Sequence, residues 1–136
     1  MASVYSNYHD LIDANSIKYG VPKVLITAVI CKESSGLPNR TGGVGEKGLM
    51  QILPAALSDS NRYSGNKFTF DEMYDIAKNI EVGTAYLAWL ASQFNGNFDL
   101  ALRAYNAGIG NVKKNPNIDP AYLAQVKAFE ELYSIT

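Results

Sequence analysis

One glutamate has a setting in which a carboxyl group could act as an acid. Residues 29–36 read VICKESSG, so Glu33 follows almost directly on the apolar run VLITAVIC. Because that run should pack into the core, we expect the carboxyl at the rim of apolar surface, where lost hydration raises its pKa. A carboxylic acid that stays protonated near neutral pH can donate a proton to a leaving oxygen, as glycosidic bond cleavage requires. The alternative is a solvated glutamate at a helix end.

A second group of residues is suited to binding sugars. The chain has nine tyrosines, and Gln51, Tyr105 and Asn106 combine ring and amide chemistry near glycines. Aromatic rings stack on sugar faces, while amides and hydroxyls bind sugar hydroxyl groups. The neighbouring Gly48 and Gly108 would let the backbone approach a ligand closely. The alternatives are aromatic core residues and glycines that end helices or form turns.

The elements that position these residues are expected to be helical. Residues 4–18 show apolar residues at helical spacing, and Gly20 ends that helix. Pro22 suits the first turn of a second helix. This second helix carries VLITAVICKE and is apolar on all sides, which indicates the central, buried helix of the fold.

The rest of the chain alternates helices with glycine-bearing loops. We expect a loop or small hairpin over residues 34–47, then a short helix opened by residues 48–57 and a second loop over 59–70. A helical stripe should follow from Asp71 to residue 91, with a candidate break at Gly83. A short helix over residues 99–106 and a last helix from Pro120 complete the chain. The prediction is a mainly α, single domain over residues 1–136.

Composition excludes several classes of function. The net charge is −1 and the pI is about 5.8, with no basic track for nucleic acid. Cys31 is the one cysteine and His9 the one histidine, which argues against a disulfide and against a zinc site. We expect no metal and no cofactor. The longest apolar run is too short to span a bilayer, and residues 1–13 do not resemble a signal peptide.

The order and spacing of short motifs resemble a known family. Glu33-Ser34 is followed by GLMQI at 48–52, NI at 79–80, GTAYL at 83–87, ALRAYNAGIGNV at 101–112 and finally Tyr122. This pattern is similar to the catalytic domain of soluble lytic transglycosylases, which are related to goose-type lysozymes. The resemblance covers roughly residues 8–133 and implies a lysozyme-like fold with a groove for the peptidoglycan glycan strand.

The resemblance also implies a reaction. The family cuts the β-1,4 bond between N-acetylmuramic acid and N-acetylglucosamine without water and leaves a 1,6-anhydro product. Glu33 would be general acid and then base, which explains how one carboxylate suffices where common hydrolytic schemes need a pair. The residues carried over to the substrate-binding site are Ser34, Met50, Gln51, Tyr105, Asn106 and Tyr122. By the same resemblance, Ser34 would help to shape the site, and the Tyr122 hydroxyl would approach Glu33 and steady it.

Two departures from the family pattern concern the site. Many members have a serine nine residues after the glutamate, where this chain has Gly42, so either Thr41 substitutes or the contact is lost. Many members also have Glu-Thr shortly before the late tyrosine, where this chain reads IDPA at 118–121. The last helix could therefore enter the site differently.

Two alternative functions remain open at this point. Goose-type lysozymes place an extra carboxylate between the catalytic glutamate and GLMQ, and Glu46 lies in that interval. If Glu46 faces the groove, it is a second carboxylate for hydrolysis; otherwise it is a solvated residue loosely paired with Lys47. The other alternative is an inactive peptidoglycan-binding module.

The biological setting is left partly open. We expect a monomer that acts on the cell wall, with peptidoglycan as partner. A phage-encoded protein, a component associated with a secretion system and a domain excised from a precursor all fit the absence of a recognisable signal peptide.

Overall fold

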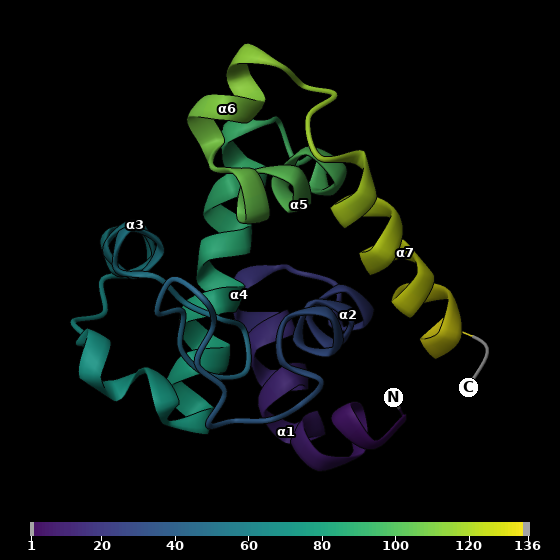
Figure 1. Ribbon diagram of the computed structural model, residues 1–136. Helices are drawn as coiled ribbons and strands as arrows, with labels where there is room; N and C mark the ends of the chain where they lie inside the picture. Colours follow the sequence, from purple (N-terminus) through teal and green to yellow (C-terminus); the bar gives the residue numbers. More distant parts are fainter. Residues whose placement is uncertain (1, 135–136) are drawn as a thin grey trace.

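The protein is built from helices joined by loops, as the computed structural model shows for residues 2–134 (Figure 1). The elements are α1 (Ala2–Tyr19), α2 (Lys23–Ser34), α3 (Pro54–Ser64), the 3-10 helix η1 (Phe70–Tyr74), α4 (Ile76–Gln93), α5 (Phe98–Ala107), α6 (Ile109–Lys114) and α7 (Pro120–Ser134). The extended pairing described in residues 2–134 consists of two isolated antiparallel bridges, which join Lys47 to Thr41 and to Ile52. The predicted mainly α fold is confirmed, and among residues 2–134 the expected loop or small hairpin is a loop that carries isolated bridges.

Helix α2 is the buried helix that the sequence predicts. Pro22 precedes its first turn, and residues 25–31 are all buried. The helix ends where Ser35 adopts a left-handed conformation (φ 55°) and donates its N–H to the Cys31 carbonyl. Helices α1 and α7 pack against α2, so its last turn lies between elements from both ends of the chain.

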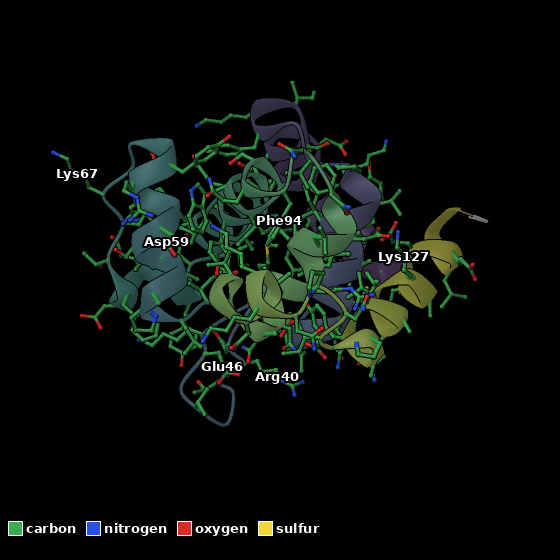
Figure 2. All side chains as sticks on the ribbon, turned by 90° about the horizontal axis from the view of Figure 1, so that it is seen from above. Arg40, Glu46, Asp59, Lys67, Phe94 and Lys127 are labelled. Carbon is green, nitrogen blue, oxygen red and sulfur yellow. The ribbon has the colours of Figure 1, made fainter. Side chains whose placement is uncertain are left out.

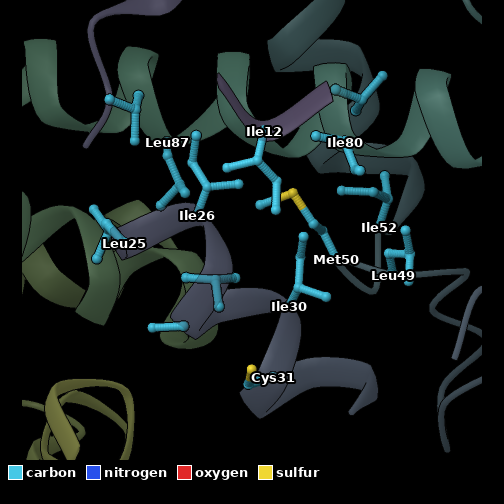
Figure 3. Packing of buried hydrophobic residues seen from close by; sticks show 14 of the residues in the cluster. Ile12, Leu25, Ile26, Ile30, Cys31, Leu49, Met50, Ile52, Ile80 and Leu87 are labelled. Atoms are coloured by element: carbon cyan, nitrogen blue, oxygen red, sulfur yellow. The ribbon is translucent and has the colours of Figure 1, made fainter. Parts of the chain in front are cut away.

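Helix α4 runs through the middle of the molecule, with α3 on one side and α7 on the other (Figure 1). It is continuous across Gly83, so the expected break there is wrong. A Cβ at Gly83 would overlap the Met50 side chain, including its Cε at 2.7 Å. Figure 3 shows Met50 in the core beside Ile26, Ile30 and Ile80. Glycine is therefore needed at this position for close packing.

Three further boundaries differ from the sequence prediction. Residues 48–51 form a turn and the helix begins only at Pro54, because Gln51 has a left-handed backbone (φ 53°). Helix α3 then continues to Ser64, where Gly65 ends it, so the expected loop starts later. Helix α6 was not predicted, because the glycines around it read as a helix end.

The caps around η1 also differ from expectation. Thr69, rather than Asp71, caps η1, in a reciprocal capping box with Glu72. Asp75 then caps α4 by accepting the Lys78 N–H. In a search confined to residues 2–134, no helix is both long enough and apolar enough to cross a membrane.

Candidate active site

Glu33 lies in the last turn of α2, with its carboxyl half-buried. The Tyr122 hydroxyl, from α7, donates a hydrogen bond to Glu33 Oε2 at 2.6 Å. Burial raises the pKa of the Glu33 carboxyl, and this outweighs the opposing effects of the Tyr122 hydrogen bond and the positive charges of Lys32 and Arg40. The negative charge of Glu46 raises the pKa further. Glu33 is therefore suited to hold a proton in a weakly hydrated position.

Two tyrosines interact with this carboxyl, of which Tyr122 is buried and Tyr105 is partly buried. Burial raises the phenol pKa of Tyr105 and of Tyr122 well above the ordinary value, and the charge of Glu33 adds to the shift in both cases. The Tyr105 hydroxyl donates to the Met50 carbonyl at 2.5 Å. Both phenols consequently stay protonated and act as hydrogen-bond donors, which leaves Glu33 as the group that can exchange a proton.

An open cavity of ≈ 260 Å³ lies against Tyr105 and Gln51. Its walls come from α3, α4, α5 and the turn before α3, and they combine the rings of Tyr86 and Tyr105 with the amides of Gln51 and Asn106. Rings and amides in one concave surface match the mixed apolar and polar surface of a sugar. Gln51, Tyr105 and Asn106 are predicted from the sequence to bind sugar. Tyr86 is a cavity residue that the sequence did not indicate.

Gln51 is fixed in orientation by the loop around it. Its Nε2 donates to the carbonyls of Arg40 (3.1 Å) and Gly48 (3.0 Å). With its donor group used in this way, the amide oxygen is directed toward Gly42. The left-handed backbone of Gln51 makes this arrangement possible, since the chain turns back on itself there.

Asn106 connects α5 to the start of α7. Its Nδ2 donates to Asp119, which has a left-handed backbone (φ 61°) directly before Pro120. Within the segment IDPA, the chain therefore enters α7 through the unusual backbone conformation of Asp119. Tyr122 nevertheless reaches Glu33, because α7 packs along α2.

Two residues expected to bind substrate have no exposed surface. Ser34 is 0% exposed, and its hydroxyl bonds the Ile30 carbonyl and the Gly36 N–H. Met50 is also 0% exposed, with its side chain in the core. The expectation that either side chain contacts a sugar directly is therefore wrong. Ser34 shapes the turn after Glu33, and Met50 contributes its backbone.

Thr41 and Glu46 flank the position of Gly42. The Thr41 hydroxyl forms a hydrogen bond with the Tyr74 hydroxyl in η1, so it does not stand in for a serine at position 42. The Lys47 ammonium lies over the Phe70 ring at 4.2 Å rather than pairing with Glu46. Glu46 instead packs its carboxyl against Gly42, at the edge of the molecule where Arg40 also lies (Figure 2).

Asn79 is a supporting residue that the sequence analysis did not single out. This buried amide donates to the carbonyls of Lys47 (2.9 Å) and Met73 (2.7 Å), and accepts the Met50 N–H (2.8 Å). These hydrogen bonds attach the loop that contributes to the cavity wall to the first turns of α4. An asparagine inside an apolar helical stripe is the sequence signal that could have identified it.

The site as a whole combines a carboxyl of raised pKa with a sugar-compatible cavity, and Tyr105 connects them, since it lines the cavity and interacts electrostatically with Glu33. Helices α2, α3, α4, α5 and α7 and the turn before α3 contribute to it, and Glu33 is the carboxyl that the Tyr122 hydroxyl fixes. Such a group can donate a proton to a leaving oxygen and then, once ionised, accept a proton from an attacking hydroxyl.

The chain is similar to several known proteins. Residues 10–126 match the family described as "Transglycosylase SLT domain", a range that includes Glu33 and Tyr122. The membrane-bound lytic murein transglycosylase E of Buchnera aphidicola subsp. Acyrthosiphon pisum (strain APS) is 35% identical over 91 residues, which cover 65% of this chain and 41% of that protein.

Solved structures show the same fold. An inactive Glu-to-Gln mutant of the lytic transglycosylase Slt of Pseudomonas aeruginosa matches with a TM-score of 0.75 and 26% identity, covering 91% of this chain and 22% of that chain. The 70-kDa soluble lytic transglycosylase of Escherichia coli matches with a TM-score of 0.73 and 26% identity, over 91% and 22% of the two chains. The 70-kDa enzyme with bulgecin A matches with a TM-score of 0.73 and 28% identity, over 88% and 20%.

Proposed function

The chain belongs to the transglycosylase SLT domain family, and on this basis we propose that it is a peptidoglycan lytic transglycosylase. It cleaves the β-1,4 bond between N-acetylmuramic acid and N-acetylglucosamine and forms a 1,6-anhydromuramoyl product. The chain spans 41% of the length of the Buchnera relative and about a fifth of the solved enzymes.

The observation that carries the proposal is the state of Glu33. Its carboxyl is half-buried, its pKa is raised by burial, and the Tyr122 hydroxyl fixes one of its oxygens at 2.6 Å. A general acid needs this combination of retained proton and fixed direction. The solved Pseudomonas relative is an inactive mutant in which a glutamate is replaced by glutamine, which agrees with such a dependence on one carboxyl.

The reaction proceeds in two proton transfers through the same group. Protonated Glu33 donates its proton to the glycosidic oxygen as the bond to the muramoyl C1 breaks. The positive charge that develops at C1 is stabilised by the substrate's own 2-acetamido group. Glu33, now a carboxylate, removes the proton from the muramoyl C6 hydroxyl, whose oxygen bonds to C1. The proton on Glu33 is restored, and no water is consumed.

The remaining site residues bind and orient the sugar. Gln51 and Asn106 contribute amide side chains to the cavity wall, and Tyr86 and Tyr105 contribute aromatic rings. Tyr122 holds the Glu33 carboxyl, with its hydroxyl as donor to the ionised form. We expect the protein to act as a monomer on the cell wall.

Product analysis tests the reaction directly. Purified peptidoglycan is digested with the protein, and the muropeptides are weighed by mass spectrometry without chemical reduction. We expect fragments ending in 1,6-anhydromuramic acid, which are 18 mass units lighter than hydrolytic products because they lack one water. Fragments ending in reducing muramic acid would overturn the proposal in favour of hydrolysis with Glu46, and intact peptidoglycan would favour a binding module.

A further inference from the structure

The space beside Gly42 is occupied by the side chain of Glu46. A Cβ at position 42 would overlap Glu46 Oε1 and lie 2.6 Å from both Glu46 Cδ and Gln51 Oε1. The φ of Gly42 is not positive, so its backbone conformation does not require glycine. A larger residue at position 42 would displace the end of the Glu46 side chain.

The loop that carries Glu46 holds its carboxyl in place. The Gly42 N–H donates to the Glu46 carbonyl at 2.8 Å, and the Val44 N–H donates to Glu46 Oε1 at 2.9 Å. At the base of the loop, Lys47 exchanges two backbone hydrogen bonds of 3.0 Å with Ile52. Glu46 is thus a preorganised carboxylate and not a freely solvated one.

Two hydrogen-bond acceptors border the same small space. Gln51 uses its Nε2 on two backbone carbonyls, so its Oε1 faces Gly42, where the Glu46 carboxyl also lies. This space borders the sugar-compatible cavity, because Gln51 also lines that cavity. Two acceptors side by side, one of them in the cavity wall, favour a ligand that offers N–H or O–H donors.

We propose that Glu46 is a substrate-binding residue that, together with Gln51, accepts hydrogen bonds from the N–H and O–H groups of the sugar beside the cleaved bond. Gly42 and Glu46 form a matched pair, since the missing side chain at position 42 makes the room that the carboxylate uses. This inference rests on the proposed function, because the donors are those of the N-acetylated glycan strand.

Binding measurements with paired variants test the role. Every variant is made in the Glu33→Gln background, and the Kd for peptidoglycan glycan strands freed of stem peptides is measured by calorimetry. Loss of a charged hydrogen bond corresponds to about a 10-fold weaker Kd or more, so we expect this for Glu46→Ala and a smaller effect for Glu46→Gln. The matched control is Asp10→Asn, an exposed charge on α1, which should leave the Kd unchanged.

Position 42 supplies the coupling test. Gly42→Ser should weaken binding about as much as Glu46→Ala, since the serine displaces the carboxylate. The double variant Gly42→Ser/Glu46→Ala should bind no more weakly than either single variant, because the same contact is lost only once. Melting temperatures are measured for all variants, so that a change in Kd is read only from folded protein.

The outcomes separate this inference from the proposed function. If the protein with Glu33 intact yields no anhydro products, the proposed function fails. If it yields them but Glu46→Ala binds glycan within twofold of its parent, or if the two single changes add in the double variant, the role of Glu46 is wrong. Glu46→Gln with Glu33 intact should also lower the upper pH limit of cleavage, because a charge that favours protonated Glu33 is removed.

Discussion

Two carboxyl groups reach the same site from regions of opposite character. Glu33 ends α2, whose residues 25–31 are buried, whereas Glu46 belongs to a loop whose neighbouring Val44 is 75% exposed. The core removes water from Glu33 and raises its pKa, while the loop uses backbone N–H groups to direct Glu46. Under the two proposals, the rigid helix positions the reacting proton and the loop positions a contact with substrate.

The largest effect should follow from removing the acid of the core region. Glu33→Gln retains the shape of the side chain but cannot exchange the proton, so cleavage of peptidoglycan should fall by at least ~100-fold. Release of soluble muropeptides measures the rate, and circular dichroism checks the fold. If the variant retained the rate of the parent protein, catalysis by Glu33 would be excluded.

The next effect concerns the connection between the two regions. Asn79→Ala removes hydrogen bonds to Lys47, Met50 and Met73 and leaves the buried Met50 N–H without its acceptor. At about 1 kcal/mol for each bond, the free energy of unfolding should decrease by roughly 3 kcal/mol. Urea denaturation measures it. A decrease below about 1 kcal/mol would mean that the loop does not depend on this anchor.

Tyr122→Phe should have an intermediate effect on catalysis and a distinctive effect on pH dependence. The phenol donates to the ionised carboxyl and so lowers the Glu33 pKa; its loss should raise that pKa further. Because the first step needs protonated Glu33, the upper pH limit of cleavage should move to higher pH. The maximal rate should fall by about 10-fold, since Glu33 loses its fixed direction. A pH–rate profile that moved to lower pH would contradict this account.

The smallest effect should appear in a matched pair of valines. Val29→Ala, in the buried helix, should lower the free energy of unfolding by about 2 kcal/mol through lost packing. Val44→Ala, in the exposed loop, should change it by less than about 0.5 kcal/mol. Denaturation of both variants under one set of conditions gives the comparison. Similar values for the two would remove the distinction between a rigid and an exposed region.

Much of the fold could be predicted because local patterns govern it. The apolar run of α2 and the helical stripe of α4 are confirmed, since burial on all sides or on one face is visible in the spacing of apolar residues. Gly83 was misread because its role depends on Met50, which is distant in sequence and packs against it. Close approach between distant residues leaves no local signal.

The site could be predicted in part for the same reason. The apolar run before Glu33 indicated a weakly hydrated carboxyl, whereas its contact with Tyr122, 89 residues away, was implied only by family resemblance. Ser34 and Met50 stand beside Glu33 and Gln51 in the motifs, yet their side chains point into the core. Neighbours in a helix or turn face different directions, so a motif alone does not show which of them reach the ligand.

The account depends most directly on the proton held by Glu33, and an NMR titration of the side-chain carboxyl carbons measures it. The Glu33 signal is assigned by its absence in Glu33→Gln. We predict that it titrates above 4.5, while Glu72, bonded to Lys78 and to Thr69, titrates at about 2. Titration of Glu33 at or below 4.5 would contradict the account, because the carboxyl would then be ionised under the conditions in which it must donate its proton.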